Sequence, residues 1–300
     1  MFGRLRWEDL DPAYLSGLIE LARQEDLEGA GLKTRPSRQE DLTTVATVDR
    51  SLRGRARLCA RRDMVVCGTS LIPLILEVYG GDCLFEPACA DGDVLAAGGC
   101  LGVLFGPVVP MLQAERVILN FLQHLSGIST HTARHVQALE GSQTRLLDTR
   151  KTTPGYRMLE KYAVACGGGW NHRLGLFGWI LVKDNHLASG GASSGMSLET
   201  KVREVVEKNP GVSVEVEVDR LDQIEAVLAG GAHIIMLDNF TNEDLVCARD
   251  MIQGRAVTEV SGGITEERLR RIAPIGLDFA SCGGLVHQSR WVDIGLDWIS

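Results

Sequence analysis

The sequence predicts an α/β protein in which an incomplete α/β barrel follows a smaller N-terminal α+β domain. From about Met111 onward, short apolar runs alternate with amphipathic segments, which is typical of parallel strands joined by helices. Before Met111 the apolar runs are separated by glycine-containing turns instead. In one later run, Val214–Val218, valines and glutamates alternate, and this pattern favours a closed sheet over an open one.

The N-terminal domain, residues 1–113, begins with a helical pattern at Pro12–Gln24, followed by a polar stretch at Leu27–Thr44. The last apolar run of the chain, Val292–Trp298, alternates with period two, so we expect residues 290–300 to rejoin this domain as a strand. Short strands of the domain are expected in the segments RARLCARRDMVVCG, GDCLFEPACADGD and GCLGVLFGPV.

The second domain, residues 114–289, is entered through an apolar helix at Met111–Leu125. The strands of the barrel, which we expect to be one short of eight, include the runs Arg145–Leu147, Trp179–Val182, Val214–Val218, Ile234–Leu237, Val257–Val260 and Leu277–Ala280. The helices between them are expected at Arg157–Cys166, Leu198–Lys208, Leu221–Leu228, Glu243–Ile252 and Glu266–Ile272. Thr241 and Thr265 are predicted N-caps, and only Thr241, with Asp244 three residues later, has the spacing of a capping box.

The run Val214–Val218 distinguishes a barrel from a doubly wound sheet. Its valines share one face, and Glu215 and Glu217 share the other. In a barrel the valines pack on the helices while the carboxylates face the interior or its mouth. In a doubly wound sheet helices cover both faces, and two carboxylates there would be costly.

Composition and charge exclude several classes of function. Lys and Arg are outnumbered by Asp and Glu, and the formal net charge of −8 argues against binding to nucleic acid or to an anionic membrane. The sequence has no apolar run of signal-peptide or membrane-spanning length, so we expect a cytoplasmic protein. The eight cysteines are scattered without a CxxC pair, which is typical of reduced, packing cysteines.

Basic residues gather in one stretch of this acidic chain, between Asp148 and His186. They suggest a small ligand that carries several negative charges, because guanidinium and ammonium groups bind carboxylate and phosphate oxygens. On the barrel interpretation, several basic and acidic residues end successive strands at the rim where barrel enzymes keep their sites. The basic residues of the stretch that we place at the rim or in the loops are Arg150, Lys151, His172, Arg173 and Lys183, and the acidic residues of the rim are Glu217 and Asp238.

Two glycine pairs follow the last two predicted strands, in Ser261-Gly262-Gly263 and Cys282-Gly283-Gly284, with His287 just beyond. Such loops expose backbone N–H groups that bind phosphate at the end of a barrel. The sequence therefore predicts a phosphate site there. It contains neither a GxGxxG after a strand nor a GxxxxGK[ST], so it favours neither a dinucleotide-binding fold nor a P-loop.

Other histidines and one lysine have alternative interpretations. His131 and His135 have the four-residue spacing of a zinc pair but lack the glutamate of HExxH, so they are interpreted as helix-surface residues. His124 and His233 are interpreted as structural. Lys183, at a strand end, is a candidate Schiff-base lysine of a barrel lyase, but the adjacent Asp184 favours its charged form and hence a role in anion binding.

Six segments, in order along the chain, closely resemble the quinolinate phosphoribosyltransferase family: AERVILNFLQHLSGIST, DTRKTTPGYRMLEKYAVACGGGWNHR, ILVKDNH, VEVEVD, IIMLDN and SGGI. The resemblance covers nearly the whole chain, weakly before residue 45 and strongly from about 114 to 287. It implies a homodimer in which the open α/β sandwich domain of one subunit caps the incomplete barrel of the other. It also implies a reaction, in which phosphoribosyl pyrophosphate and quinolinate, with Mg²⁺, give nicotinate mononucleotide, pyrophosphate and CO₂ in NAD biosynthesis.

The resemblance further implies roles for the rim residues. Arg150, His172, Arg173 and Lys183 would line the quinolinate pocket beside Thr149, with Arg116 reaching in from the partner subunit. Glu217 and Asp238 would bind ribose hydroxyls and waters around Mg²⁺, and Lys151 would contact anionic groups of both substrates. The 5′-phosphate would be held by Ser261, Gly262, Gly263, Cys282, Gly283, Gly284 and His287. Lys151, Lys183, Glu217 and Asp238 are the implied catalytic residues.

The chain departs from the family pattern in two places. A polar insert, residues 27–39, separates Glu25-Asp26 from Asp41-Leu42-Thr43, and Cys282 stands where an aliphatic residue is common. Two alternatives stay open beside the family's own reaction: a paralogue of the same fold that uses another acceptor, and the Schiff-base lyase that uses Lys183.

Overall fold

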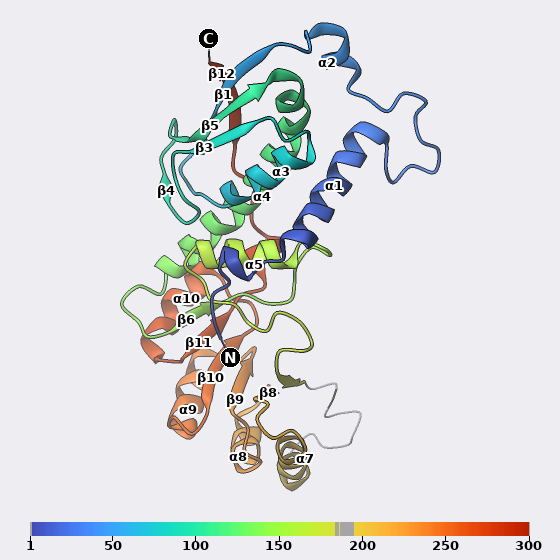
Figure 1. Cartoon of the computed structure of the whole chain (residues 1–300). Helices are drawn as coiled ribbons and strands as arrows, with labels where there is room; N and C mark the ends of the chain where they lie inside the picture. Colours follow the sequence, from blue (N-terminus) through green and yellow to red (C-terminus); the bar gives the residue numbers. More distant parts are fainter. Residues whose placement is uncertain (1, 184–185, 187–194, 300) are drawn as a thin grey trace. The chain divides into compact units, whose positions relative to one another are not determined.

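The computed structural model describes residues 2–183, 186 and 195–299 (Figure 1). The chain forms two compact units. Unit 1 consists of Met1–Arg4, Thr132–Thr153 and Gly169–Gln288, and unit 2 consists of Leu5–His131, Pro154–Gly168 and Ser289–Ser300.

Unit 1 is built on a six-stranded sheet whose strands are ordered β6-β11-β10-β9-β8-β7. All neighbours in this sheet are parallel, as the sequence predicts. The strands are β6 (Arg145–Leu147), β7 (Ile180–Val182), β8 (Val214–Val218), β9 (Ile234–Asp238), β10 (Val257–Ser261) and β11 (Phe279–Ser281). The expected seventh strand is not found, because among the described residues β6 and β7 are the edges of a six-stranded sheet. The barrel is therefore incomplete by one strand more than expected.

Helices join the parallel strands and end close to the predicted residues. They are α7 (Gly195–Lys208), α8 (Ile224–Ala229), which follows the 3₁₀ turn η3 (Leu221–Gln223), α9 (Asn242–Ile252), α10 (Glu266–Ile272), which precedes the 3₁₀ turn η4 (Ala273–Ile275), and α11 (Gly284–His287). Both predicted N-caps are confirmed: the Thr241 hydroxyl accepts the Asp244 N–H at 3.1 Å, and the Thr265 hydroxyl accepts the Arg268 N–H at 3.2 Å. Side-chain caps of this kind hold helix starts at the strand ends that carry the site.

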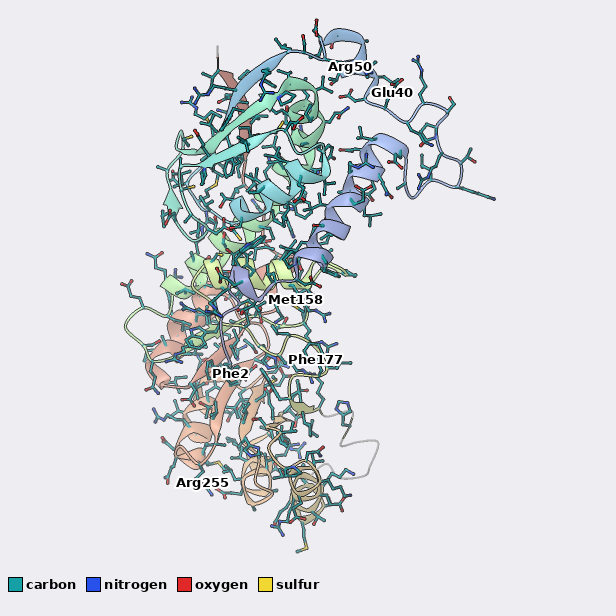
Figure 2. The ribbon with its side chains drawn as sticks, in the orientation of Figure 1. Phe2, Glu40, Arg50, Met158, Phe177 and Arg255 are labelled. Atoms are coloured by element: carbon teal, nitrogen blue, oxygen red, sulfur yellow. The ribbon has the colours of Figure 1, made fainter. Side chains whose placement is uncertain are left out.

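Strand β8 shows the predicted division of its two faces. Val214 and Val216 are fully buried among the apolar residues of the unit. Glu215 is also fully buried, where it accepts a hydrogen bond of 2.6 Å from the indole N–H of Trp179, and Glu217 reaches the cavity at the strand ends. The carboxylates thus face the interior and mouth of the barrel, as expected. Phe2, labelled in Figure 2, adds to the interior by packing on Trp179, with ring centroids 5.1 Å apart.

Unit 2 contains an antiparallel sheet in the order β12-β1-β5-β3. Its strands are β1 (Arg53–Ala60), β3 (Leu84–Pro87), β5 (Cys100–Pro107) and β12 (Ile294–Ile299), and a two-stranded ribbon pairs β2 (Met64–Val65) with β4 (Val94–Leu95). Its helices are η1 (Trp7–Asp9), α1 (Pro12–Glu28), α2 (Leu42–Thr47), η2 (Thr69–Leu71), α3 (Ile72–Val78), α5 (Arg157–Cys166) and most of α4 (Val108–Gln137). Strand β12 pairs with β1 from Arg55 to Ala60, which confirms the predicted return of the C-terminal segment.

The two units are divided at other residues than the expected boundary between 113 and 114. Helix α4 is continuous from Val108 to Gln137, and unit 1 begins again only at Thr132. One interpretation needs correction on this helix: His135 is buried at 5% exposure and does not lie on the helix surface. His124 and His233 are structural, as predicted, because His124 pairs with Glu160 at 2.9 Å and the His233 ring accepts the Val214 N–H at 3.0 Å. Within the described residues, no helix is long and apolar enough to span a bilayer.

Candidate active site

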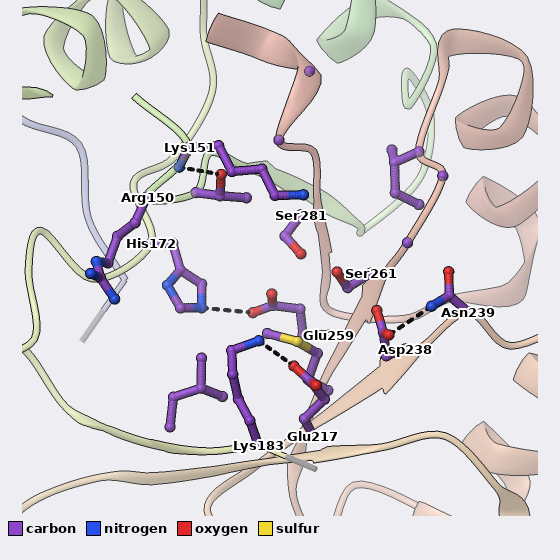
Figure 3. A pocket seen from close by; sticks show the side chains of 18 of the residues that line it. Arg150, Lys151, His172, Lys183, Glu217, Asp238, Asn239, Glu259, Ser261 and Ser281 are labelled. Carbon is purple, nitrogen blue, oxygen red and sulfur yellow. Dashed lines mark hydrogen bonds and ion pairs between the residues drawn. The ribbon is translucent and has the colours of Figure 1, made fainter. Parts of the chain in front are cut away.

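A cavity of about 760 Å³ lies at the carboxyl ends of the parallel strands of unit 1 (Figure 3). Strand ends supply most of its wall, since side chains that follow β6, β7, β8, β9 and β10 meet there. This convergence was predicted from the sequence. The predicted residues that line the cavity are Thr149, Arg150, Lys151, His172, Arg173, Lys183, Glu217, Asp238, Ser261, Gly262, Gly263, Gly283, Gly284 and His287.

Two arginines lie close together on one side of the cavity. Arg173 is only 9% exposed, and its guanidinium donates to the Trp179 carbonyl at 3.3 Å. Burial, together with the positive charge of Arg150, lowers the pKa of Arg173 below its usual value. Within the described part of the chain, the buried Arg150 Nε atom has no hydrogen-bond partner. Two guanidinium groups that line one cavity, one of them with a buried donor unused, are the arrangement expected of a site that binds carboxylate or phosphate.

A buried aspartate, Asp148, holds the segment that carries His172 and Arg173. It accepts the His172 backbone N–H at 2.8 Å and the Asn171 side-chain amide at 2.7 Å. Trp170 pairs with Leu147 as an isolated bridge, so the segment is tied to the end of β6. The histidine and the arginine are therefore held in place by the backbone, which favours a pre-organised site.

Two carboxylates stand opposite the arginines. Glu217 Oε2 accepts a hydrogen bond of 2.6 Å from the Lys183 Nζ, and Asp238 Oδ2 accepts one of 2.7 Å from the Asn239 amide. The Lys183 Nζ atom is thus engaged with a carboxylate, whereas a Schiff-base lysine needs its amine free to attack a carbonyl group. This contact argues against the lyase alternative. Asp184, which is expected from the sequence to favour the charged form of Lys183, lies outside the described residues.

The glycine loop after β10 packs tightly against the end of β9. Gly262 has φ +89°, and a Cβ at that position would lie 2.1 Å from the Asn239 Oδ1. Asn239 itself adopts φ +59°. Arg268, from α10, fixes the loop by donating hydrogen bonds to the Gly262 carbonyl and, at 2.7 Å, to the Phe240 carbonyl. Only glycine fits at residue 262, because both the backbone conformation and the space exclude a side chain.

The glycine loop after β11 lies beside Lys151. A Cβ at Gly283 would lie 2.7 Å from the Lys151 Cδ, so the glycine leaves room for the lysine chain. His287 is exposed at the rim of the same cavity. Cys282 differs from expectation. Its side chain is 2% exposed, its Sγ bonds to the Ile264 carbonyl, and its N–H donates to Leu147 in the sheet. Because both groups are occupied by the protein, Cys282 does not line the cavity.

Arg116 also does not line the cavity of its own chain. It lies on α4, in unit 2, with its side chain exposed. Its expected contribution to a second subunit stays a prediction.

Several residues of the site were not predicted. Glu259, Asn239 and Ser281 line the cavity, while Asp148 and Arg268 support it. Glu259 gave a signal that could have been used, because a glutamate in the otherwise strand-forming run Val257–Val260 resembles the pattern at Glu215. Arg268 gave none, since arginine in an amphipathic helix is usually exposed.

Comparison with known proteins agrees with this architecture. Residues 128–297 match the family described as "Quinolinate phosphoribosyl transferase, C-terminal domain", and residues 41–126 match the corresponding N-terminal domain. The nicotinate-nucleotide pyrophosphorylase [carboxylating] of Mycobacterium leprae is 39% identical over 264 residues, which cover 86% of this chain and 90% of the relative. The chloroplastic enzyme of the same name from Arabidopsis thaliana is 35% identical over 301 residues, covering 95% and 83%.

Solved structures give the same result. NadC from Streptococcus pyogenes superposes with a TM-score of 0.87 at 35% identity, covering 97% of this chain and 99% of that one. The nicotinate-nucleotide pyrophosphorylase from Francisella tularensis has a TM-score of 0.86 at 34% identity, covering 97% and 98%. The two domain matches in chain order, relatives aligned over most of their lengths and the basic cavity at the strand ends agree: the chain belongs to the quinolinate phosphoribosyltransferase family.

Proposed function

We propose that this protein transfers the phosphoribosyl group of phosphoribosyl pyrophosphate to the ring nitrogen of quinolinate and releases one carboxylate as CO₂. The products are nicotinate mononucleotide and pyrophosphate, and the reaction belongs to NAD biosynthesis. The observation that carries this proposal is the pair of adjacent guanidinium groups, Arg150 and Arg173, in a cavity whose opposite wall bears Glu217 and Asp238.

The acceptor carboxylates are assigned to the basic wall. Quinolinate carries two adjacent carboxylates, and Arg150, Arg173, His172 and Lys183 supply enough donors for both. The planar guanidinium group of arginine can bind both oxygens of a carboxylate, and partial burial strengthens the attraction between the two groups. An acceptor with a single carboxylate would leave part of this positive charge without a partner, which supports a dicarboxylate.

The acidic wall suits the ribose. As pyrophosphate leaves, positive charge develops on the ribose ring, and the nearby carboxylates of Glu217 and Asp238 stabilise it. The same carboxylates bind ribose hydroxyls before the reaction. No residue needs to act as a nucleophile.

Magnesium fits the donor set at this wall. Glu217 and Asp238 present carboxylate oxygens, and each uses one oxygen for a protein hydrogen bond. Mg²⁺ prefers oxygen ligands and usually keeps several waters, so these residues would hold it through water together with the phosphates of the substrate. When bound, Mg²⁺ neutralises charge on the departing pyrophosphate.

Lys151 and the glycine loops are assigned to the phosphates. Lys151 extends past Gly283 into the cavity, where its ammonium group can bind the pyrophosphate and an acceptor carboxylate. The loops at Ser261–Gly263 and Gly283–Gly284, with His287, offer donors for the 5′-phosphate. Cys282 is left out of this assignment because its side chain and N–H are already bonded.

Loss of CO₂ needs positioning more than acid–base chemistry. Once the ring nitrogen is alkylated, the pyridinium accepts the electron pair released as the neighbouring carboxylate leaves as CO₂, and a proton replaces it on the ring carbon. The enzyme promotes this step by holding the ring and by removing water from the departing carboxylate.

A homodimer completes the proposed site. The cavity of one chain would receive Arg116 from α4 of its partner. The Arg116 side chain is exposed in the single chain. An exposed arginine outside the basic cavity supports this assignment. The cytoplasmic location remains a prediction from the sequence, and cell fractionation tests it.

The reaction is tested by incubating the protein with phosphoribosyl pyrophosphate, Mg²⁺ and either quinolinate or nicotinate. We expect nicotinate mononucleotide from quinolinate only, identified by its mass. Product from nicotinate, with none from quinolinate, would reject the proposed acceptor. Borohydride trapping of a substrate at Lys183 would instead support the lyase.

A further inference from the structure

Arg268 lies outside the active-site cavity and bonds to two loops that form part of its wall. Gly262 and Gly263 line that cavity, whereas Arg268 belongs to α10 and does not. Its guanidinium group donates one hydrogen bond to the Gly262 carbonyl and another, of 2.7 Å, to the Phe240 carbonyl. The arginine therefore ties the loop after β10 to the turn after β9.

The place of Arg268 in its helix explains how it reaches these carbonyls. It is the third residue of α10, and helical side chains point back toward the N-terminus, so this one runs over the loop that precedes the helix. Arg268 also lines a second cavity, of about 450 Å³, at the starts of α9 and α10. Because neither Gly262 nor Gly263 lines that second cavity, the arginine lies on the side of the loop opposite the active site.

The peptide between Gly262 and Gly263 is oriented by this contact. Both residues have positive φ, +89° and +55°, and their peptide bond is trans. The carbonyl and the N–H of a planar trans peptide point in opposite directions. Since the Gly262 carbonyl points outward to Arg268, the Gly263 N–H points toward the active-site cavity. No group among the described residues accepts a hydrogen bond from this N–H, so the loop presents an unused donor.

We propose that Arg268 is a positioning residue, which holds the Gly262–Gly263 peptide with its N–H directed at the 5′-phosphate of phosphoribosyl pyrophosphate. The hydrogen bond to the carbonyl also polarises the peptide and so strengthens the N–H as a donor. The guanidinium group itself contacts no substrate. The identity of the ligand rests on the proposed function, whereas the orientation of the peptide is a property of the free protein.

The side chain of Arg268 can be tested apart from its backbone. The Arg268 N–H donates to the hydroxyl of the N-cap Thr265 at 3.2 Å. A substitution of the side chain keeps this bond, so α10 should still form. Any effect on substrate binding can then be assigned to the two lost hydrogen bonds rather than to loss of the helix.

Steady-state kinetics is the first test. Arg268→Met, which keeps the length of the side chain without its donors, should raise the KM for phosphoribosyl pyrophosphate about 10-fold to 100-fold, the range of one lost hydrogen bond to a charged group. We expect kcat to fall by less and the KM for quinolinate to change little. Arg268→Lys should recover part of the loss, because an ammonium group can still reach one carbonyl. In Arg268→Ala, added ethylguanidinium, which replaces the missing atoms, should lower the KM again.

Arg271→Met is the matched control. Arg271 lies on the same helix and lines the same outer cavity, but it is exposed and pairs with Glu267. This variant should leave both KM values unaltered. An unchanged KM for phosphoribosyl pyrophosphate in Arg268→Met, or an equal rise in the control, would overturn the proposal.

NMR observes the peptide itself and needs no reaction. In protein labelled with glycine that carries ¹³C in its carbonyl group and ¹⁵N in its amide, a carbonyl-to-amide correlation selects the few Gly–Gly peptides of the chain. The signal of Gly262–Gly263 is assigned by its loss in Gly263→Ala. Added ribose 5-phosphate should move the Gly263 amide proton to lower field in the wild type and leave it in place in Arg268→Met.

The results separate this proposal from the proposed function. No response of the Gly263 amide in the wild type, or the same response in Arg268→Met, would reject the role of Arg268. A response that depends on Arg268, in a protein that forms no nicotinate mononucleotide, would reject only the proposed function.

Discussion

We propose that Arg150 and Arg173 bind the acceptor, because the charge of Arg150 acts on Arg173 and the buried Arg150 Nε has no hydrogen-bond partner among the described residues. In Arg150→Ala and in Arg173→Ala we expect the Kd for quinolinate, measured by calorimetry, to rise about 30-fold or more, since removing one member of a buried charge pair costs about 2–5 kcal/mol. Arg255→Ala is the control, because Arg255 is exposed, forms a surface ion pair with Glu225 and does not line this cavity. Normal affinity in both cavity variants would refute the pocket assignment.

Gly262 tests the phosphate loop. A methyl group there would collide with Asn239, which in turn donates to Asp238. We expect Gly262→Ala to raise the KM for phosphoribosyl pyrophosphate at least about tenfold, because each ~1.4 kcal/mol of misplaced contact costs a factor of ten. The Kd for quinolinate should change little.

Gly254→Ala is the matched control for this glycine. Gly254 has φ +71°, similar to the +89° of Gly262, but nothing lies within 4 Å of its Cβ position. It should lose about 1–2 kcal/mol of stability from backbone strain and keep both substrate constants. If the two alanine variants behave alike, the contact with Asn239 has no functional role.

The raised pKa of Glu259 predicts how the free energy of unfolding depends on pH. Its pKa is raised in the folded protein, so its contribution is fully present below the unfolded value of about 4.5 and is lost as pH rises toward the folded value. Replacing it with neutral glutamine removes this loss. The free energy of unfolding of Glu259→Gln relative to wild type should therefore increase with pH above that value, as measured by urea denaturation at several pH values. A difference independent of pH would contradict a raised pKa of Glu259.

The sequence allowed us to predict which side chains line the cavity when they follow or end a strand. It did not allow us to predict the side chains that hold the loops of the cavity in place. Arg150, Lys183, Glu217 and Asp238 each follow or end a strand, so their place at the rim follows from the order of the strands alone. Asp148 and Arg268 act on backbone groups of loops, and these contacts depend on loop conformations that apolar periodicity does not encode. Cys282 was assigned to the phosphate because its position after β11 did not reveal that its N–H bonds to Leu147.

At the scale of elements, the strands of unit 1 were predictable because buried parallel strands are short, apolar and bounded by helices. Strand β11 begins two residues later than the predicted Leu277, and the Asp278 side chain there accepts from the Thr258 backbone and hydroxyl. The pattern of apolar runs alone did not determine the number of strands in the barrel, because closure of a barrel depends on pairing between its edge strands.

Helix α9 gives a prediction at this scale. Its N-cap, Thr241, satisfies the Asp244 N–H, and α9 starts directly after the β9 residues that carry Asp238 and Asn239. Thr241→Ala should lower the free energy of unfolding by about 1 kcal/mol in urea denaturation. Thr200→Ala is the control, because the exposed Thr200 hydroxyl donates to the Met196 carbonyl within α7 and does not cap the helix. An equal loss in the two variants would mean that the cap has no special effect.

At the scale of the whole molecule, the proposed dimer makes each site depend on two chains. Lys151→Ala and Arg116→Ala should each inactivate the homodimer. When the two inactive proteins are unfolded and refolded together in equal amounts, half of the dimers combine both chains, and each of these has one intact site. Activity should therefore return to about a quarter of the wild-type value.

The control mixes Lys151→Ala with Arg150→Ala, whose residues line the same cavity of one chain. Every site in that mixed dimer would keep one substitution, so activity should not return. Recovery in this control, or none in the first mixture, would reject the contribution of Arg116 across the interface.

The central claim is that one cavity joins phosphoribosyl transfer to the loss of a carboxylate. Quinolinate labelled with ¹⁴C in the carboxyl group adjacent to the ring nitrogen measures this directly. We predict one labelled CO₂ for each nicotinate mononucleotide formed, and release only when phosphoribosyl pyrophosphate and Mg²⁺ are present. Release of CO₂ without phosphoribosyl pyrophosphate, or a product that keeps the label, would contradict the account.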